Sequence, residues 1–141
     1  MTVALRRRVR WSSLALLLAS STACGHIVAV VSAKSTVVTL TRAQVADIFL
    51  GRSRRFPDGN RAVPIDQPPG SLARAEFYVN LVGKTSAQLE EYWSKIIFTG
   101  RGQPPQSAPT SAEVKRWLTE NPAAIGYIES DLVDATVKVV F

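Results

Sequence analysis

The stretch from Ala62 to Val82 constrains the fold of this chain more than any other part of the sequence. A short apolar run ends in Asp66, a Pro-Pro-Gly turn follows, and an amphipathic helical pattern begins after Ser71. A strand that enters a helix through such a turn directs the helix N-terminus, with its unpaired N–H groups, beyond the end of the strand. This corner is a place where an anion can bind.

Four residues at this corner are candidates for holding an oxyanion. Gly70, Ser71 and Leu72 supply backbone N–H groups and a hydroxyl, and Asp66 is the only acid at a strand end near a helix start. Backbone donors and a hydroxyl are what an oxyanion requires when no chemistry is performed on it. The competing interpretation is that Ser71 is only the N-cap of an ordinary helix.

The N-terminal region has the composition of a secretory signal peptide. Four arginines lie within the first ten residues, Trp11 to Ala19 form a short apolar run, and small residues lead to Ala23. The apolar run is too short to span a bilayer as an ordinary helix. We therefore assign residues 1–23 to a signal peptide and expect export, to the periplasm or the outer face of the cytoplasmic membrane. Three consecutive arginines leave a twin-arginine signal open.

Cys24 is the only cysteine and becomes the first residue of the mature chain if cleavage follows Ala23. Small residues before a cysteine resemble the bacterial lipoprotein signal, which makes Cys24 a lipidation candidate, although Ser21 stands where leucine is more usual. The alternative is a plain signal peptide that leaves an unmodified thiol. A membrane contact is therefore expected only through an N-terminal lipid, and a single cysteine cannot form an intramolecular disulfide.

The net charge of +6 comes largely from the signal segment. Without it, thirteen basic residues stand against eleven acidic ones. A nucleic-acid partner is not expected, because the only basic cluster left lies in the segment from Arg52 to Arg61. Arg54 in that segment, and Ser32 in the polar break after the first apolar run, complete the set of oxyanion candidates.

Residues 24–141 suit one domain with a single core. Apolar runs predict strands at 27–31, 62–66, 123–128 and 137–141, the third alternatively a helix end followed by a strand. The run at 27–31 is continuous and β-branched, which is typical of a strand buried on both faces of a parallel sheet. Gly126 in the third run allows a close approach of another backbone.

Helix starts are marked by a repeated pattern. Thr41 with Gln44, Thr85 with Gln88 and Thr110 with Glu113 have the spacing of a capping box, and each precedes an apolar helical period. Together with the helix after Ser71, they predict about four helices around a mainly parallel sheet, an α/β fold. The expected buried stripes include Leu72 and Ile97, and residues 99–109 are expected to form a loop.

Catalysis is not expected. The single histidine, His26, and the single cysteine both lie at the N-terminus of the mature chain, so nucleophilic triads and histidine-bearing metal sites are not available. No glycine-rich nucleotide-binding motif is present. We expect no metal and no cofactor. A hydrolase would need Asp66 to face a second carboxylate or a metal.

Several motifs, in this order, resemble the phosphate-binding subunits of bacterial ABC transporters. They are ADIFLG at 46–51, VPID at 63–66 leading into Gly70-Ser71, IFTG at 97–100 and NPAAIGYI at 121–128. The closest likeness is to short, single-domain members, and it extends over about residues 27–141. It implies a single small lobe of the type 2 periplasmic-binding-protein fold, inorganic phosphate or a similar oxyanion as ligand, and an ABC transporter permease or another envelope protein as partner in uptake or sensing.

The binding turn departs from the family pattern. In full-length members an Arg-x-Asp-Gly-Ser-Gly-Thr turn surrounds phosphate, whereas here Asp66 stands at or near the arginine and Leu72 follows Gly70-Ser71. Arg52, Arg54 and Arg74 are the arginines available as substitutes. The changed turn leaves open a second interpretation, a ligand-free protein-interaction or sensory module on the same fold, in which the basic segment faces an acidic partner.

Overall fold

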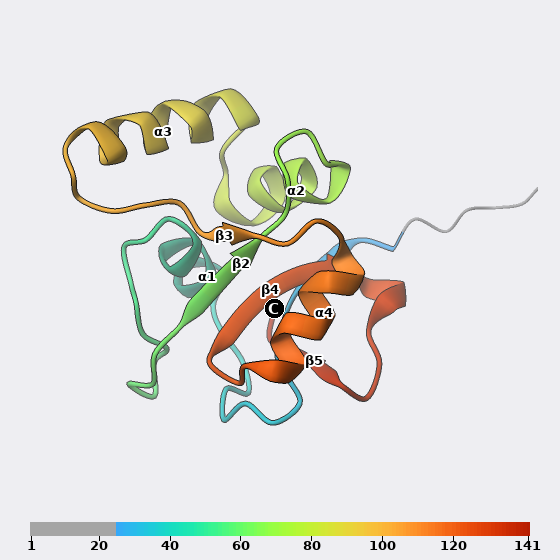
Figure 1. The fold of residues 1–141 in the computed structure, drawn as a ribbon. Helices are drawn as coiled ribbons and strands as arrows, with labels where there is room; N and C mark the ends of the chain where they lie inside the picture. Colours follow the sequence, from blue (N-terminus) through green and yellow to red (C-terminus); the bar gives the residue numbers. More distant parts are fainter. Residues whose placement is uncertain (1–24) are drawn as a thin grey trace, which may run out of the picture.

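A five-stranded sheet lies at the centre of residues 25–141, the part of the chain that the computed structural model describes (Figure 1). In chain order the strands are β1 (Ile27–Ser32), β2 (Val63–Asp66), β3 (Gln106–Ser107), β4 (Ala124–Glu129) and β5 (Val137–Val139). The order in the sheet is β3-β2-β4-β1-β5, with β2 parallel to β3 and β4, and β1 antiparallel to β4 and β5. Every strand except β1 therefore runs in one direction, and the predicted mainly parallel α/β sheet is confirmed.

The direction of β1 differs from the prediction. All of β1 is buried, as the continuous apolar run indicates, but it runs antiparallel to both of its neighbours. Burial on both faces reports only that a strand is central and covered on each side. It carries no information about direction, which here is set by the pairing with β4 and β5.

Within residues 25–141 four α-helices pack around the sheet, in agreement with the expected number. They are α1 (Arg42–Phe49), α2 (Leu72–Phe77), α3 (Ser86–Phe98) and α4 (Ser111–Glu120). A π-helix, η1 (Tyr78–Val82), continues α2, and a 3-10 turn, η2 (Ser130–Leu132), precedes β5. The expected loop at 99–109 contains β3, which lies at the sheet edge and pairs with the end of β2.

The capping predictions hold fully at two helices and partly at a third. Thr41 and Gln44 form both hydrogen bonds of a capping box, as do Thr85 and Gln88. At α4 the Thr110 hydroxyl accepts from the Glu113 N–H, but the Glu113 carboxylate lies 2.7 Å from an Arg116 nitrogen. A guanidinium one turn along the helix offers that carboxylate a charged partner, so the return bond to the cap does not form.

Each face of the sheet carries its own apolar cluster. In β1, Ala29 and Val31 face the cluster made with α1, α2, η1 and α3, while Val28 and Val30 face the cluster that α4 covers (Figure 1). This alternation is the period of two that a strand imposes on its side chains. The sheet is therefore covered on both sides, as its buried central strands require.

Two residues expected in buried stripes are exposed. Leu72 is 87% exposed and Ile97 is 55% exposed, so these two predictions are wrong. Leu72 is the first residue of a six-residue helix, and the buried residues that anchor α3 to the core are Leu89 and Trp93, which precede its last turn. The C-terminal end of α3 projects beyond the sheet (Figure 1), so Ile97 has no core to face.

No helix within residues 25–141 combines the length and the apolar character that crossing a membrane requires. Residues 1–24, with the predicted signal peptide and Cys24, lie outside the described part of the chain.

Gly126 in β4 has helix α4 packed directly against it. A Cβ at this position would lie 2.5 Å from Val114 Cγ1, whereas the nearest backbone atom, the Ile65 oxygen, would be 3.7 Å away. The close approach predicted at this glycine therefore comes from a helix side chain rather than from another backbone.

Replacing Gly126 is expected to separate α4 from the sheet. We expect Gly126→Ala to lower the free energy of unfolding by about 1–3 kcal/mol, because overpacking forces neighbouring side chains to move. Gly102→Ala is the matched control, since its Cβ would meet Ile96 Cγ2 at an ordinary 3.5 Å. Urea denaturation measures both, and equal effects of the two substitutions would contradict this packing.

Candidate oxyanion-binding site

The carboxylate of Asp66, at the C-terminal end of β2, is buried and accepts four hydrogen bonds. The Tyr127 hydroxyl (2.5 Å) and the Gln67 N–H (2.8 Å) donate to Oδ1. The Tyr78 hydroxyl (2.9 Å) and Arg74 Nε (3.3 Å) donate to Oδ2. Because an ionised carboxylate only accepts, every neighbour of this group has the right polarity. Asp66 thus connects β2 to β4 and to α2 and η1.

Aromatic packing holds the two tyrosines in place. The Phe77 ring stacks on Tyr127 with centroids 4.0 Å apart and packs edge-on against Tyr78 at 5.2 Å. Both tyrosines are almost completely buried. Their hydroxyls therefore have Asp66 as a fixed partner.

Burial raises the pKa of Tyr78 and of Tyr127 well above the usual value for a phenol, and the negative charge of Asp66 and the hydrogen bonds to it raise both pKa values further. A phenolate beside this carboxylate would be a second negative charge in the protein interior. Both hydroxyls therefore stay protonated and act as donors at neutral pH.

Arg74 connects this network to solvent. Its Nε contacts Asp66, its guanidinium lies 5.2 Å from the centre of the Tyr78 ring, and its side chain is 16% exposed. It lines a cleft of about 400 Å³, which we call the Arg74 cleft. The other residues lining the Arg74 cleft are Asp66, Gln67, Pro69, Gly70, Ser86, Glu90, Trp93, Ser94, Ile97, Pro104, Pro105 and Ser107.

Some of the hydrogen-bond donors at the Gly70–Leu72 corner already have partners within the protein. Ser71 is the N-cap of α2, since its hydroxyl accepts from the Arg74 N–H at 3.2 Å, and its own N–H donates to Pro68 O at 3.1 Å. The N–H groups of Gly70 and Leu72 make no hydrogen bond within residues 25–141. The cap role of Ser71 is therefore confirmed, and a role of this corner in binding stays a prediction.

The remaining sequence candidates lie elsewhere. Ser32 is buried at the end of β1, where its hydroxyl accepts from the Lys34 N–H at 3.2 Å. Arg54 lines a different cleft, and Arg52 forms an exposed ion pair with Asp47. Of the three arginines considered as substitutes, the structure brings only Arg74 to the corner.

The chemistry of this site suits binding. Both oxygens of Asp66 are occupied by protein donors, which leaves this carboxylate poorly suited to accept a proton from a substrate. Glu90 lines the same cleft but is not bonded to Asp66. Within residues 25–141 no group of three or more histidine, cysteine, aspartate or glutamate residues could hold a metal ion.

Several residues that form the Asp66 network or line the Arg74 cleft could not be predicted from the sequence. Tyr78 and Tyr127 lie 12 and 61 residues from Asp66, and Ser107 reaches the cleft only because β3 pairs with β2. The one available indication was Tyr78 itself, a polar group within an expected buried stripe. Gln67, next to Asp66, donates from its side-chain Nε2 to the backbone oxygen of Tyr127 at 3.0 Å.

Known structures share this fold. No protein-family model matches the chain, and no curated protein matches it in sequence. A solved Clostridium perfringens protein, assigned as a phosphate ABC transporter substrate-binding protein and containing bound phosphate, matches with a TM-score of 0.65 and 23% identity. An ABC-type phosphate transport receptor from Vibrio cholerae matches with a TM-score of 0.63 and 20% identity, and PstS from Borrelia burgdorferi with 0.60 and 14%.

These three matches each cover 82% of this chain but only 44%, 45% and 46% of the known chains, in the same order. The chain thus spans less than half the length of the structures it resembles. It has the α/β fold of a periplasmic-binding-protein lobe, the fold found in phosphate ABC transporter substrate-binding proteins.

The two buried tyrosines make stability sensitive to alkaline pH. Unfolding returns each phenol to a pKa of about 10, whereas the folded protein holds both pKa values higher. Below pH ~10 the two phenols are protonated in both the folded and the unfolded protein, so their full contribution to stability is present. Above pH ~10 the phenols lose their protons only in the unfolded protein, so the free energy of unfolding falls. We expect the urea midpoint of the wild type to fall more steeply above this pH than that of the Tyr78→Phe/Tyr127→Phe variant.

At neutral pH each single Tyr→Phe change should lower the free energy of unfolding by about 1–3 kcal/mol, since Asp66 loses a donor. Tyr92→Phe is the control, because its hydroxyl donates to Leu50 O and not to Asp66. An alkaline slope that is the same in the wild type and the double variant would show that these phenols are not held as described.

Proposed function

We propose that residues 24–141 form an exported solute-binding domain that binds phosphate or a related oxyanion, in uptake or sensing linked to an ABC transporter. One observation carries this proposal: Arg74 is fixed by the buried Asp66 at the wall of a cleft that Gly70 also lines. The fold shared with phosphate-binding proteins supports the same ligand class.

Arg74 is suited to receive an oxyanion. A guanidinium has five N–H donors in a planar fork, which matches the oxygens of phosphate. Only Nε is bonded within residues 25–141, so the two terminal nitrogens are available. The Asp66 carboxylate and the Tyr78 ring fix the plane of the group, which reduces the entropy lost when a ligand binds.

The acidic residues near Arg74 reduce the affinity expected for an oxyanion. Asp66 offsets much of the positive charge of Arg74, and Glu90 adds a negative charge to the lining. Binding should therefore be weaker than at an unpaired arginine of equal burial, and the free N–H groups of Gly70 and Leu72 become important additional donors.

Removing the guanidinium of Arg74 should weaken phosphate binding. We expect Arg74→Ala to raise the dissociation constant for inorganic phosphate about tenfold or more, measured by calorimetric titration, with Arg74→Lys intermediate. Arg116→Ala is the control, because Arg116 is exposed on α4 and pairs with Glu113 and Glu120.

Thermal unfolding of the same variants separates a loss of binding from a loss of fold. No heat with millimolar phosphate or sulfate in the wild type would contradict the proposal. Unchanged affinity in a folded Arg74→Ala variant would contradict the assigned site.

A protein-interaction or sensory module is the second candidate function. The observation that favours it is the exposed surface: Phe98 is 92% exposed, Leu72 is 87% exposed, and neither Arg54 nor Arg55 has a carboxylate partner within residues 25–141. An envelope partner captured by the wild type and lost from an Arg54→Glu/Arg55→Glu variant would support this function. Retention of every partner would oppose it.

We also propose that residues 1–23 direct export and that Cys24 carries a lipid. Expression of the full chain in a Gram-negative bacterium should place the wild type in the membrane fraction, with the added mass of a lipid, and Cys24→Ala in a soluble fraction. His26→Ala should fractionate as the wild type. A soluble, exported wild type would indicate a plain signal peptide, and a cytoplasmic one would contradict export.

A further inference from the structure

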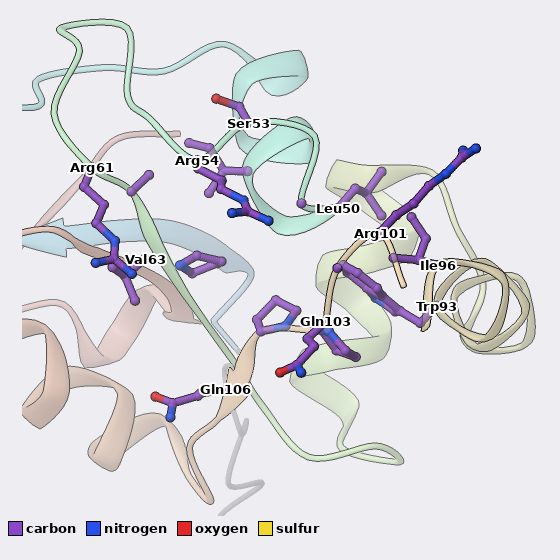
Figure 2. A pocket seen from close by; sticks show the side chains of 17 residues that line it. Leu50, Ser53, Arg54, Arg61, Val63, Trp93, Ile96, Arg101, Gln103 and Gln106 are labelled. Carbon is purple, nitrogen blue, oxygen red and sulfur yellow. The ribbon is translucent and has the colours of Figure 1, made fainter. Parts of the chain in front are cut away.

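A second cleft, of about 560 Å³, lies between the α1–β2 loop and the α3–β3 loop. We propose that this cleft, which we call the Arg54 cleft, binds an organic anion: a molecule with a phosphate or carboxylate group on an apolar body. Its volume is within the usual range for small-molecule sites. Figure 2 shows its lining, which includes Arg54, Arg61, Trp93, Ile96, Gln103 and Gln106.

Positive charge in this cleft is not neutralised. Arg54 and Arg61 lie on the same side of it, and neither forms an ion pair or a side-chain hydrogen bond within residues 25–141 (Figure 2). None of the lining residues is acidic. In contrast, the Arg74 cleft contains Asp66 and Glu90. The Arg54 cleft is therefore the more electropositive of the two, and an anion there meets no repelling carboxylate.

The loop that carries both arginines is held in a defined shape. The Ala62 N–H donates to Arg54 O at 2.9 Å, and Arg55 and Arg61 form an antiparallel bridge. At the tip of the loop the Thr36 hydroxyl donates to Asp58 at 2.7 Å. These contacts place the two arginines on adjacent, hydrogen-bonded backbone segments, so the loop backbone is already ordered and only the exposed arginine side chains lose freedom when a ligand binds.

The opposite side of the Arg54 cleft is apolar, and Trp93 at its base is closely packed. Trp93 is only 5% exposed, and its ring edge is so close to Gly51 that a Cβ there would lie 3.2 Å from Cη2. Ile96, Pro104 and Pro105 extend this surface. Inorganic phosphate could use only the arginine side, whereas an anion with an apolar body would also cover the exposed parts of Ile96, Pro104 and Pro105.

Neutral polar groups are available near both sides. The side chains of Gln103 and Gln106 line the cleft and make no hydrogen bond within residues 25–141. Their amides can donate or accept, which would fix the orientation of a ligand that also carries hydroxyl or carbonyl groups. The combination of two arginines, two amides and an apolar wall defines the class of ligand.

Phenyl phosphate is a suitable probe, since it joins an oxyanion to an apolar ring. We expect saturable binding followed by amide chemical shifts in ¹H–¹⁵N NMR spectra, with the largest changes in residues 51–54 and 101–106. Phenol, which lacks the charge, and inorganic phosphate, which lacks the ring, should each bind this cleft at least about tenfold more weakly.

Arg54→Ala/Arg61→Ala should weaken phenyl phosphate binding about tenfold or more. Arg101→Ala is the control: it removes one positive charge from the same lining, against two in the double variant, but its guanidinium points away from the cleft (Figure 2), so less than about a twofold change is expected. Both arginines are exposed, and circular dichroism checks that the double variant is folded.

The test of the Arg54 cleft does not depend on whether inorganic phosphate binds in the Arg74 cleft. Arg74→Ala should leave phenyl phosphate binding at residues 51–54 and 101–106 unchanged, whatever it does to inorganic phosphate. Absence of saturable shifts at millimolar phenyl phosphate, shifts confined to residues 66–74, equal binding of phenol, or unchanged affinity in the folded double variant would each overturn the proposal.

Discussion

The buried carboxylate of Asp66 is the contact on which the site depends. A charge removed from water is costly unless it is paired and hydrogen-bonded, and here two phenols, a backbone N–H and a guanidinium all donate to it. The three side-chain donors come from β4, α2 and η1, so one side chain at the end of β2 links these elements. Arg74 is thereby held at the wall of a cleft.

The domain has two clefts that would surround an anion differently. In the Arg74 cleft the guanidinium is well oriented but shares its charge with Asp66, which favours weaker anion binding than an unpaired arginine would give. In the Arg54 cleft Arg54 and Arg61 form no ion pair within residues 25–141 and face an apolar wall. Residues 104 and 105 and Trp93 line both clefts, so the α3–β3 loop separates them. We therefore propose one site for a small oxyanion, at Arg74, beside a broader site for an organic anion.

Much of this fold could be predicted because it depends on interactions between residues that are close in the sequence. Capping hydrogen bonds act over three residues and apolar periods over a few turns, so the four helix starts and the buried strands could be predicted from the sequence. The direction of β1 and the two-residue strand β3 could not, because only pairing with distant strands determines them. Within the site, Gly70 and Asp66 were predicted to lie together, but Asp66 is satisfied by tyrosines that no local pattern connects to it, and Ser32 and Arg54 lie apart because the topology places their loops elsewhere.

The most direct test of the central claim is the position of a bound oxyanion. Tungstate is a tetrahedral anion like phosphate, and its anomalous scattering locates it without ambiguity in a crystal of this protein. We expect a tungstate peak within hydrogen-bonding distance of the terminal nitrogens of Arg74 and of the Gly70 or Leu72 N–H. A crystal with no peak in the Arg74 cleft, or with tungstate only beside Arg54 and Arg61, would contradict it.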